Sequence, residues 1–207
     1  MSSRTLILLH GPAGSGKSSV ARKVCELSGA HTAALADPLK HWLHRYCGVQ
    51  AYLLWGESKL RSELVTIKTA SSAAEDEETG DLGPLIDQFS KQHANETMTV
   101  RLAITSLGDV LPRRNCEYVH KLLIQTHSLF VVPDLRYVED LRYFKERPEL
   151  ARVVAIKLQR PGSGYAQTHP SDYELPDELF DFILQNEGSV AHTATEIMRR
   201  STVVDPS

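Results

Sequence analysis

The chain has 207 residues, of which 42% are hydrophobic and 24% are charged, and its net charge is −3. This composition is that of a globular protein with one sizeable core and argues against extensive disorder. The charge balance also argues against the basic surface with which proteins bind nucleic acid polymers, so any nucleotide partner should be small.

The three cysteines, Cys25, Cys47 and Cys116, are odd in number and lack the paired spacing of zinc ligands. They predict neither a disulfide framework nor a metal cage, and they fit a reducing cytoplasm. The N-terminal apolar run is too short to span a membrane and leads into a motif instead of a cleavage site. We therefore expect a cytoplasmic protein without a membrane partner.

The first predicted elements follow from hydrophobic periodicity. Residues 6–9 form a continuous apolar run, which is typical of a strand buried on both faces of a parallel sheet. Residues 17–28 carry apolar side chains at three- and four-residue spacing and predict an amphipathic helix. Residues 31–36 can form a second strand, and residues 38–46 a helix with Asp37 in the cap position.

A phosphate-binding loop is predicted between the first strand and the first helix. Residues 11–18, GPAGSGKS, match G-x-x-x-x-G-K-[ST] without a gap. In this context the backbone N–H groups and the helix N-terminus bind the phosphates of a nucleotide. We expect Lys17 to contact the β- and γ-phosphates of ATP, Ser18 to ligate Mg²⁺, and Ser19 to bond the α-phosphate. The loop residues predicted to bind ATP are Gly11, Gly14, Ser15, Gly16, Lys17, Ser18 and Ser19.

Residues 69–83 differ from the rest of the chain in composition. They contain almost no large apolar residue, and residues 75–78 are all acidic. Such a segment should be solvated and mobile on the surface. The alternative is a segment that becomes ordered when a substrate binds.

Three later apolar runs, residues 129–132, 153–158 and 180–184, alternate with helical patterns and bring the count to about five strands. The expected fold is therefore the α/β three-layer sandwich of P-loop proteins. It has a central, mostly parallel sheet with helices on both faces.

Three charged residues follow the ends of predicted strands, where ligands gather in open α/β sheets. Asp134 can hold Mg²⁺ or orient the acceptor oxygen, and Arg136 can share its face and neutralise the transferred phosphoryl group. A surface ion pair is the alternative for these two. Arg160, followed by two glycines, is expected to belong to a lid, or else to a plain connecting loop.

The class of P-loop protein is narrowed by what the sequence lacks. The guanine-reading segment N-K-x-D of GTPases does not occur, and no second acid follows Asp134 as in multi-subunit ATPases. A small-molecule kinase is therefore favoured over a switch or a motor.

Six segments resemble the bacteriophage-type deoxynucleoside monophosphate kinases, which belong to the P-loop nucleoside monophosphate (NMP) kinase superfamily. They are GPAGSGKS, ALADPLK, LWGESKLR, TSLGDVLPR, VVPDLRYVEDL and FDFILQNEGSV. The resemblance extends from residue 6 to about residue 198. Its most particular elements are D-x-R-x-x-E at residues 134–139 and D-x-x-x-x-N-x-G-S at residues 181–189. A phage source is implied by the resemblance alone.

The resemblance implies in-line transfer of the γ-phosphate of ATP to a deoxynucleoside monophosphate (dNMP), with Lys17, Arg136, Arg160 and Asp134 as catalytic residues. Ser18 and Asp134 would hold Mg²⁺. It implies monophosphate-side roles for Asp37, Lys40, Trp55, Arg61, Arg113, Arg114 and Arg136, and adenine-side roles for Asn186, Gly188 and Ser189.

Two departures from the family pattern affect these roles. Residues 110–114 read VLPRR where W-G-R is expected, so Arg113 and Arg114 are both candidates for one site. Residues 169–172 read HPSD where the lid has H-x-S-E, and the shorter acid can shift the closed lid and the base selectivity.

The implied organisation is a single kinase domain spanning residues 1–207. Its core comprises residues 1–36, 100–158 and 178–200, with an NMP-binding excursion at about 37–99 and a lid at about 159–177. ATP and a dNMP are the expected partners, and a homodimer is as compatible with the sequence as a monomer. The alternatives are a kinase for another small acceptor, such as a nucleoside or hydroxyl metabolite, and a non-catalytic ATP-binding regulatory module.

Overall fold

The computed structural model describes residues 4–111, 115–124, 128–165 and 169–202. The chain divides into two units, which are described separately. Unit 1 comprises residues 1–35 and 116–207, and unit 2 comprises residues 36–115. The predicted residues Arg113 and Arg114, and residues 166–168 of the expected lid, lie outside the described residues.

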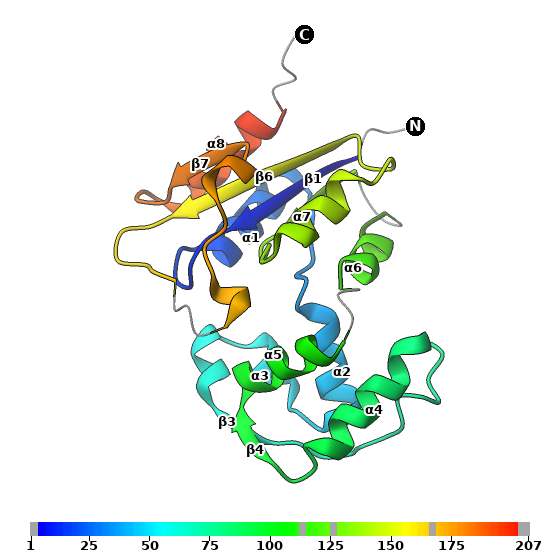
Figure 1. Ribbon diagram of the computed structural model, residues 1–207. Coiled ribbons are helices and arrows are strands. Elements are labelled where there is room, and N and C mark those ends of the chain that lie inside the picture. The colour runs from blue at the N-terminus through cyan, green and yellow to red at the C-terminus, as the bar shows by residue number, and fades with distance from the viewer. Residues whose placement is uncertain (1–3, 112–114, 125–127, 166–168, 203–207) are drawn as a thin grey trace. The chain divides into compact units, whose positions relative to one another are not determined.

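Unit 1 is built on a five-stranded sheet in which all the described strand pairs are parallel (Figure 1). The phosphate-loop strand β1 lies at its centre, between β5 and β6. In spatial order the strands are β2 (His31–Thr32), β5 (Leu129–Val132), β1 (Thr5–His10), β6 (Arg152–Gln159) and β7 (Phe182–Gln185).

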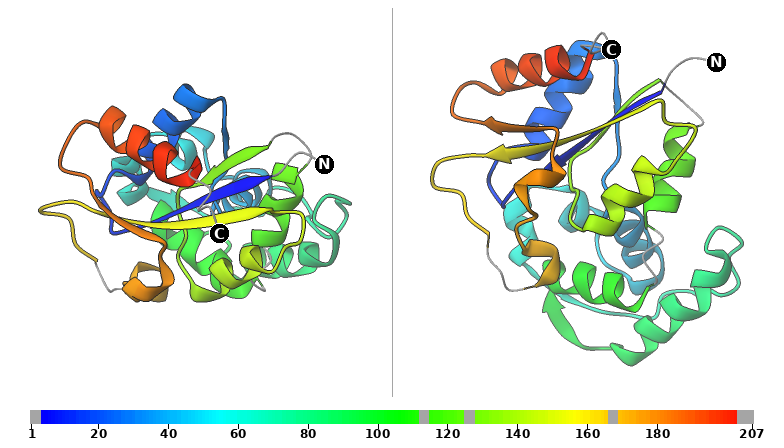
Figure 2. Two further views of the ribbon diagram at one scale, coloured as in Figure 1. Left: turned by 90° about the horizontal axis from the view of Figure 1, so that it is seen from above. Right: turned by 45° about the horizontal axis from the view of Figure 1, so that its top comes forward.

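Helices cover both faces of this sheet because the side chains of each strand alternate between the faces. Ile7 and Leu9 of β1 pack in a cluster with residues of α1 (Lys17–Ser28) and α8 (Val190–Thr202). Leu6 and Leu8 pack on the opposite face with residues of α6 (Asn115–Ile124) and α7 (Val138–Lys145). Figure 2 shows the two pairs of helices on either side of the strands. The predicted α/β three-layer architecture is confirmed.

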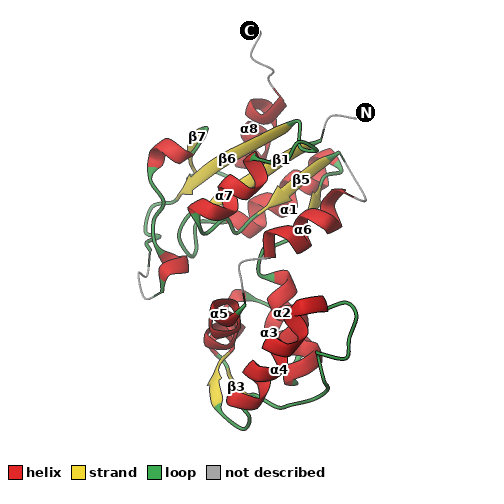
Figure 3. Cartoon of the chain, turned by 45° about the vertical axis from the view of Figure 1, so that its right-hand side comes forward, coloured by secondary structure: helices red, strands yellow, loops and turns green. Residues whose placement is uncertain are grey.

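Unit 2 has a hydrophobic core of its own (Figure 3). Its described residues form the α-helices α2 (Asp37–Cys47), α3 (Ala51–Trp55), α4 (Gly83–Gln92) and α5 (Val100–Val110). A two-stranded antiparallel sheet joins β3 (Leu64–Thr66) to β4 (Thr97–Thr99). The sequence assigned residues 100–110 to the kinase core, but the apolar face of α5 packs in the cluster that contains α2.

The segment 69–83 is more structured than its composition suggests. Ala73 is buried, and its backbone N–H donates to Asp87 Oδ1 over 2.6 Å. Thr79 is also buried and donates its hydroxyl to the Ala73 carbonyl, while the Tyr46 hydroxyl donates to Asp76. Most of the segment is nevertheless exposed, as its composition suggests. Hydrogen bonds join Ala73 to α4 and Asp76 to α2, and the mobility of the segment stays a prediction.

Predicted elements agree best with the structure where the apolar pattern is strongest. The strand at residues 129–132 and the helix at residues 17–28 have the predicted bounds. The second strand is shorter than expected, and Asp37 is the first residue of α2 instead of its cap, which is Ala36. In the described parts of the chain, every helix is too short or too polar to traverse a bilayer.

Candidate active site

The loop between β1 and α1 has the conformation that a phosphate-binding loop requires. Gly11 and Gly16 adopt φ angles of 149° and 92°, which disfavour residues with a side chain. A Cβ atom at Gly11 would lie 2.3 Å from the Leu158 carbonyl oxygen, and one at Gly16 would lie 2.4 Å from Asn186 Nδ2. Glycine is therefore needed at both positions for backbone conformation and for space.

The N-terminus of α1 is suited to bind an anion. The helix begins at Lys17, no side chain caps it, and its first turn carries no acidic residue. Its leading backbone N–H groups lack intrahelical partners and concentrate positive potential at this end of the helix. Ser18 and Ser19 are exposed beside them. Phosphate oxygens would satisfy these donors.

The ammonium group of Lys17 folds back over the loop. Its Nζ donates to the carbonyl oxygens of Gly11 and Pro12 over 2.6 and 2.7 Å, and approaches Ser15 Oγ at 3.3 Å. Burial and, to a smaller extent, the positive charge of Arg136 lower the pKa of Lys17 to about 8, while the negative charge of Asp134 opposes the decrease. Lys17, Asp134 and Arg136 therefore act on one another electrostatically at one end of the sheet.

Asp134 and Arg136 lie on the turn that follows β5, the neighbour of β1. The Leu35 backbone N–H donates to Asp134 Oδ1 over 2.7 Å, and Leu135 N–H donates to the Leu9 carbonyl over 3.1 Å. Arg136 Nη1 lies 3.5 Å from Asp172 Oδ1. The structure thus places both predicted residues beside the phosphate loop, and the turn that carries them is hydrogen-bonded to the end of β1.

Asp140 stabilises the same turn through hydrogen bonds of its buried carboxylate, and its role was not predicted from the sequence. Its carboxylate accepts hydrogen bonds from the backbone N–H of Tyr137, over 3.2 Å, and from Cys116 Sγ, over 3.3 Å. Burial raises the pKa of Asp140, and these hydrogen bonds oppose the rise. The sequence signal was an acid three residues after the helix N-cap Tyr137. The D-x-R-x-x-E element had drawn attention to Glu139, which is exposed.

Of the residues expected near adenine, Asn186 links the phosphate loop to α8 through hydrogen bonds. Asn186 is buried, its Nδ2 donates to the Ser15 carbonyl over 2.8 Å, and its Oδ1 accepts from the Thr193 hydroxyl. Ser189 Oγ accepts from the His192 backbone N–H at the start of α8. Gly188 is exposed between them. Contact of Asn186, Gly188 or Ser189 with adenine stays a prediction, while the link from Asn186 to the phosphate loop is observed.

Arg160, expected in the lid, follows β6 and is exposed to solvent. The backbone N–H and hydroxyl of Ser163 both donate to the Arg160 carbonyl and close a tight turn around Gly162. This turn holds the backbone of Arg160 and leaves the guanidinium in solvent. Its role in transfer stays a prediction.

Apart from Arg136 of unit 1, the described residues that are predicted on the monophosphate side belong to unit 2. Lys40 is buried and pairs with Asp37, with 2.6 Å between Nζ and Oδ1. Trp55 is 45% exposed at the end of α3, with its ring edge-on to His44. Arg61 Nη2 donates to the carbonyl of Leu54. Trp55 is therefore a surface residue, as a base-stacking residue must be, and Arg61 reaches the same end of α3.

The oxygen donors at the phosphate loop suit magnesium, which prefers hydroxyl, carboxylate, phosphate and water oxygens. The Ser18 hydroxyl is exposed at the start of α1, and Asp134 is close enough for its charge to affect the pKa of Lys17. Within the described residues, no cluster of three or more His, Cys, Asp or Glu side chains could hold a metal.

Comparisons with known proteins find similarity in structure only. No protein-family model matches the sequence, and no curated protein matches it. The APS kinase CysC of Mycobacterium tuberculosis, in complex with AMPPNP and APS, has a TM-score of 0.48 and 16% identity, over 96% of this chain and 98% of that chain. Shikimate kinase from Acinetobacter baumannii, in complex with shikimate, has a TM-score of 0.43 and 13% identity, over 96% and 92% of the chains. Similarity this low does not identify a substrate.

Proposed function

We propose that this protein transfers the γ-phosphoryl group of ATP to a deoxynucleoside monophosphate, which yields the diphosphate and ADP. The observation that carries the proposal is the arrangement of Lys17, Asp134 and Arg136 around a glycine-dependent phosphate loop. This arrangement supports phosphoryl transfer from a nucleotide. The choice of a monophosphate as acceptor is supported by the sequence resemblance.

Nucleotide binding would begin with an exchange of partners at Lys17. Its ammonium group is held by two carbonyl oxygens of the loop. The β- and γ-phosphate oxygens carry full negative charge and form stronger hydrogen bonds with an ammonium group than carbonyl oxygens do. The loop therefore holds Lys17 close to the position from which it would bind the triphosphate.

Ser18 and Asp134 are the residues that would hold Mg²⁺, the first directly and the second directly or through water. When bound, the ion neutralises charge on the β- and γ-phosphates. The Leu35 backbone N–H donates to Asp134 Oδ1 and so restrains the carboxylate.

The transfer step needs positioning and charge stabilisation more than proton transfer. An oxygen of the acceptor phosphate is already anionic at neutral pH, so it can attack the γ-phosphorus without a general base. A bond forms between them while the bond from the γ-phosphorus to the β–γ bridging oxygen breaks, and ADP leaves with the electron pair. Arg136, oriented by Asp172, and Arg160 would neutralise the charge on the transferred group.

The acceptor would be recognised by residues of unit 2, including Arg113 or Arg114. Lys40 and Arg61 would contact the monophosphate, together with Arg113 or Arg114, and Trp55 would stack on the base. Because Lys40 is paired with Asp37, acceptor binding would place its phosphate next to an existing ion pair.

The test is a measurement of ADP release from ATP and Mg²⁺, with dAMP, dGMP, dCMP or dTMP added separately and Lys17→Ala as the blank. We expect stimulation by at least one monophosphate in the wild type and none in Lys17→Ala. Stimulation only by nucleosides or hydroxyl metabolites would replace the proposal with a kinase for another acceptor. ATP binding without stimulation by any acceptor would favour a regulatory module.

A further inference from the structure

A second polar cluster is buried at the carboxyl ends of β1 and β6, next to the phosphate loop. His10 and Lys157 are register partners on the two strands, and they are only 3% and 1% exposed. His10 directly precedes Gly11, the first residue of the loop. Burial of two titratable side chains at this position is costly unless their polar atoms are satisfied.

The partners of His10 fix its tautomer. Its Nδ1 lies 2.9 Å from the carbonyl oxygen of Leu135, which can only accept a hydrogen bond. Its Nε2 lies 3.3 Å from the backbone nitrogen of Leu175, which can only donate, and 3.0 Å from the Tyr165 hydroxyl. The ring must therefore carry its proton on Nδ1 and be neutral. Burial lowers the pKa of His10 to about 4, which agrees with this assignment.

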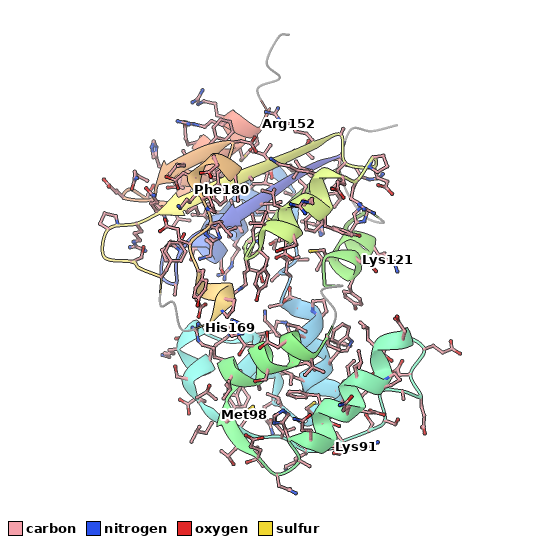
Figure 4. All side chains as sticks on the ribbon, viewed as in Figure 1. Lys91, Met98, Lys121, Arg152, His169 and Phe180 are labelled. Carbon is pink, nitrogen blue, oxygen red and sulfur yellow. The ribbon has the colours of Figure 1, made fainter. Side chains whose placement is uncertain are left out.

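Two aromatic rings hold the imidazole in place. Tyr165 and Phe180, the latter labelled in Figure 4, stack on His10 with interplanar angles of 20° and 21°. Ring position and hydrogen bonding therefore restrict His10 to one orientation.

Lys157 binds the segment around Leu175, which His10 also contacts. Its Nζ donates to the Leu175 carbonyl over 3.3 Å, and it forms ion pairs of 2.5 Å with Glu174 and Asp177. The N–H of Leu175 is thus bound by His10 and its carbonyl by Lys157. Both polar groups of this residue are held by side chains from neighbouring strands.

These contacts act on both members of the Arg136–Asp172 pair. Leu135, whose carbonyl is bound by His10, immediately precedes Arg136. Leu175 lies three residues after Asp172, which is the last residue of a short 3₁₀ turn. His10 is therefore hydrogen-bonded to both segments that carry the pair, one through each ring nitrogen.

We propose that His10 and Lys157 are positioning residues that hold Arg136 in place beside the phosphate loop, by fixing Leu135 and Leu175 on either side of the Arg136–Asp172 pair. The proposal rests on the proposed phosphoryl transfer for its effect on rate. Its structural part, the fixing of the two segments, is independent of the substrate.

His10→Phe tests the structural part, because it keeps the stacked ring and removes both ring nitrogens. We expect amide hydrogen exchange at Leu135 and Leu175 to accelerate about tenfold or more, as for the loss of a hydrogen bond that holds a segment. Unchanged exchange at both amides would overturn the proposal. The measurement needs no activity, so it remains decisive if no acceptor is found and the proposed function fails.

Tyr165→Phe provides a milder variant in case His10→Phe does not fold. It removes one hydroxyl that donates to a histidine ring, and Tyr143→Phe removes a hydroxyl of α7 that lies 3.4 Å from Nδ1 of His120 in α6. We expect Tyr165→Phe to lower kcat several-fold with the KM for ATP unchanged, and Tyr143→Phe to leave both unchanged. Equal effects of the two variants would contradict a positioning role.

A double-variant comparison tests the route to Arg136. If His10 acts through the Arg136–Asp172 pair, His10→Phe should lower kcat about tenfold in the wild type and much less in an Asp172→Asn background. Multiplicative losses in the double variant would show that His10 acts independently of the pair and would overturn this route.

Discussion

At the scale of single residues, the phosphate site depends on Lys17, which loses its proton at a lower pH than an ordinary lysine does. Lys17 is partly buried against two loop carbonyls, and this burial together with the charge of Arg136 lowers its pKa to about 8. Bound phosphates favour the charged form and raise this pKa. Nucleotide binding above pH 8 should therefore be coupled to uptake of one proton by Lys17.

We predict that ATP affinity falls as pH rises above about 8, by up to about tenfold per pH unit. The sign follows because the free protein loses the Lys17 proton in this range while the complex retains it. Calorimetry at pH 8.5 in two buffers of different ionisation enthalpy should show proton uptake in the wild type and little in Lys17→Arg, whose charge is fixed. Equal uptake in the two proteins would assign the proton to another group.

Two glycines of the loop separate the effect of backbone strain from that of steric collision. Gly14 and Gly16 both have positive φ, but a Cβ atom at Gly14 meets nothing within 4 Å, whereas one at Gly16 collides with Asn186. We predict that Gly14→Ala lowers the free energy of unfolding by about 1 kcal/mol. Gly16→Ala should lower it by roughly 3 kcal/mol, because strain and collision add. Urea unfolding measures both, and equal losses would show that Asn186 moves aside without cost.

At the scale of elements, α7 and the turn before it depend on a buried cap. Asp140 accepts the Tyr137 backbone N–H, whereas its neighbour Glu139 is exposed. We predict that Asp140→Ala lowers the free energy of unfolding by about 2 kcal/mol, within the range of lost helix caps and buried hydrogen bonds. It should also lower kcat, because the turn that carries Asp134 loosens. Glu139→Gln is the matched control and should change stability by less than about 0.5 kcal/mol. A larger loss in Glu139→Gln than in Asp140→Ala would show that Glu139 of the D-x-R-x-x-E element, and not Asp140, stabilises the turn.

The sequence predicts elements well where the information is local. The apolar run at residues 129–132 and the motif at residues 11–18 specify a strand and a loop through adjacent residues, and both are observed. The contact between Asn186 and Ser15 joins residues 171 positions apart. It depends on the packing of the loop after β7 and of α8 against the phosphate loop, which no local pattern encodes. The same holds for His10, whose partners Leu135 and Tyr165 come from other parts of the chain.

At the scale of the whole molecule, the donor and acceptor functions are expected on different units. The phosphate loop, Asp134 and Arg136 belong to unit 1, and Lys40, Trp55 and Arg61 to unit 2. Variants of unit 2 should therefore affect the acceptor and leave ATP binding unchanged. The sequence predicted that the kinase core resumes at residue 100. Residues 100–110 belong to unit 2 instead, because the apolar face of α5 packs in one hydrophobic cluster with that of α2.

Two aromatic residues of α3 test this separation. Trp55 is 45% exposed and Tyr52 is 62% exposed, and only Trp55 is expected to stack on the acceptor base. We predict that Trp55→Ala raises the KM for the monophosphate about tenfold, in line with the loss of one stacked base. Tyr52→Ala should change it less than twofold, and neither should change the Kd for ATP. An equal change in both variants would place the acceptor elsewhere.

The most direct test of phosphoryl transfer to a monophosphate is to follow the label from ATP labelled at the γ-phosphate. With Mg²⁺ and the preferred deoxynucleoside monophosphate, the account predicts that the label appears in the deoxynucleoside diphosphate with the wild type and not with Lys17→Ala. Label that remains in ATP, or appears only as inorganic phosphate whichever monophosphate is added, would contradict it.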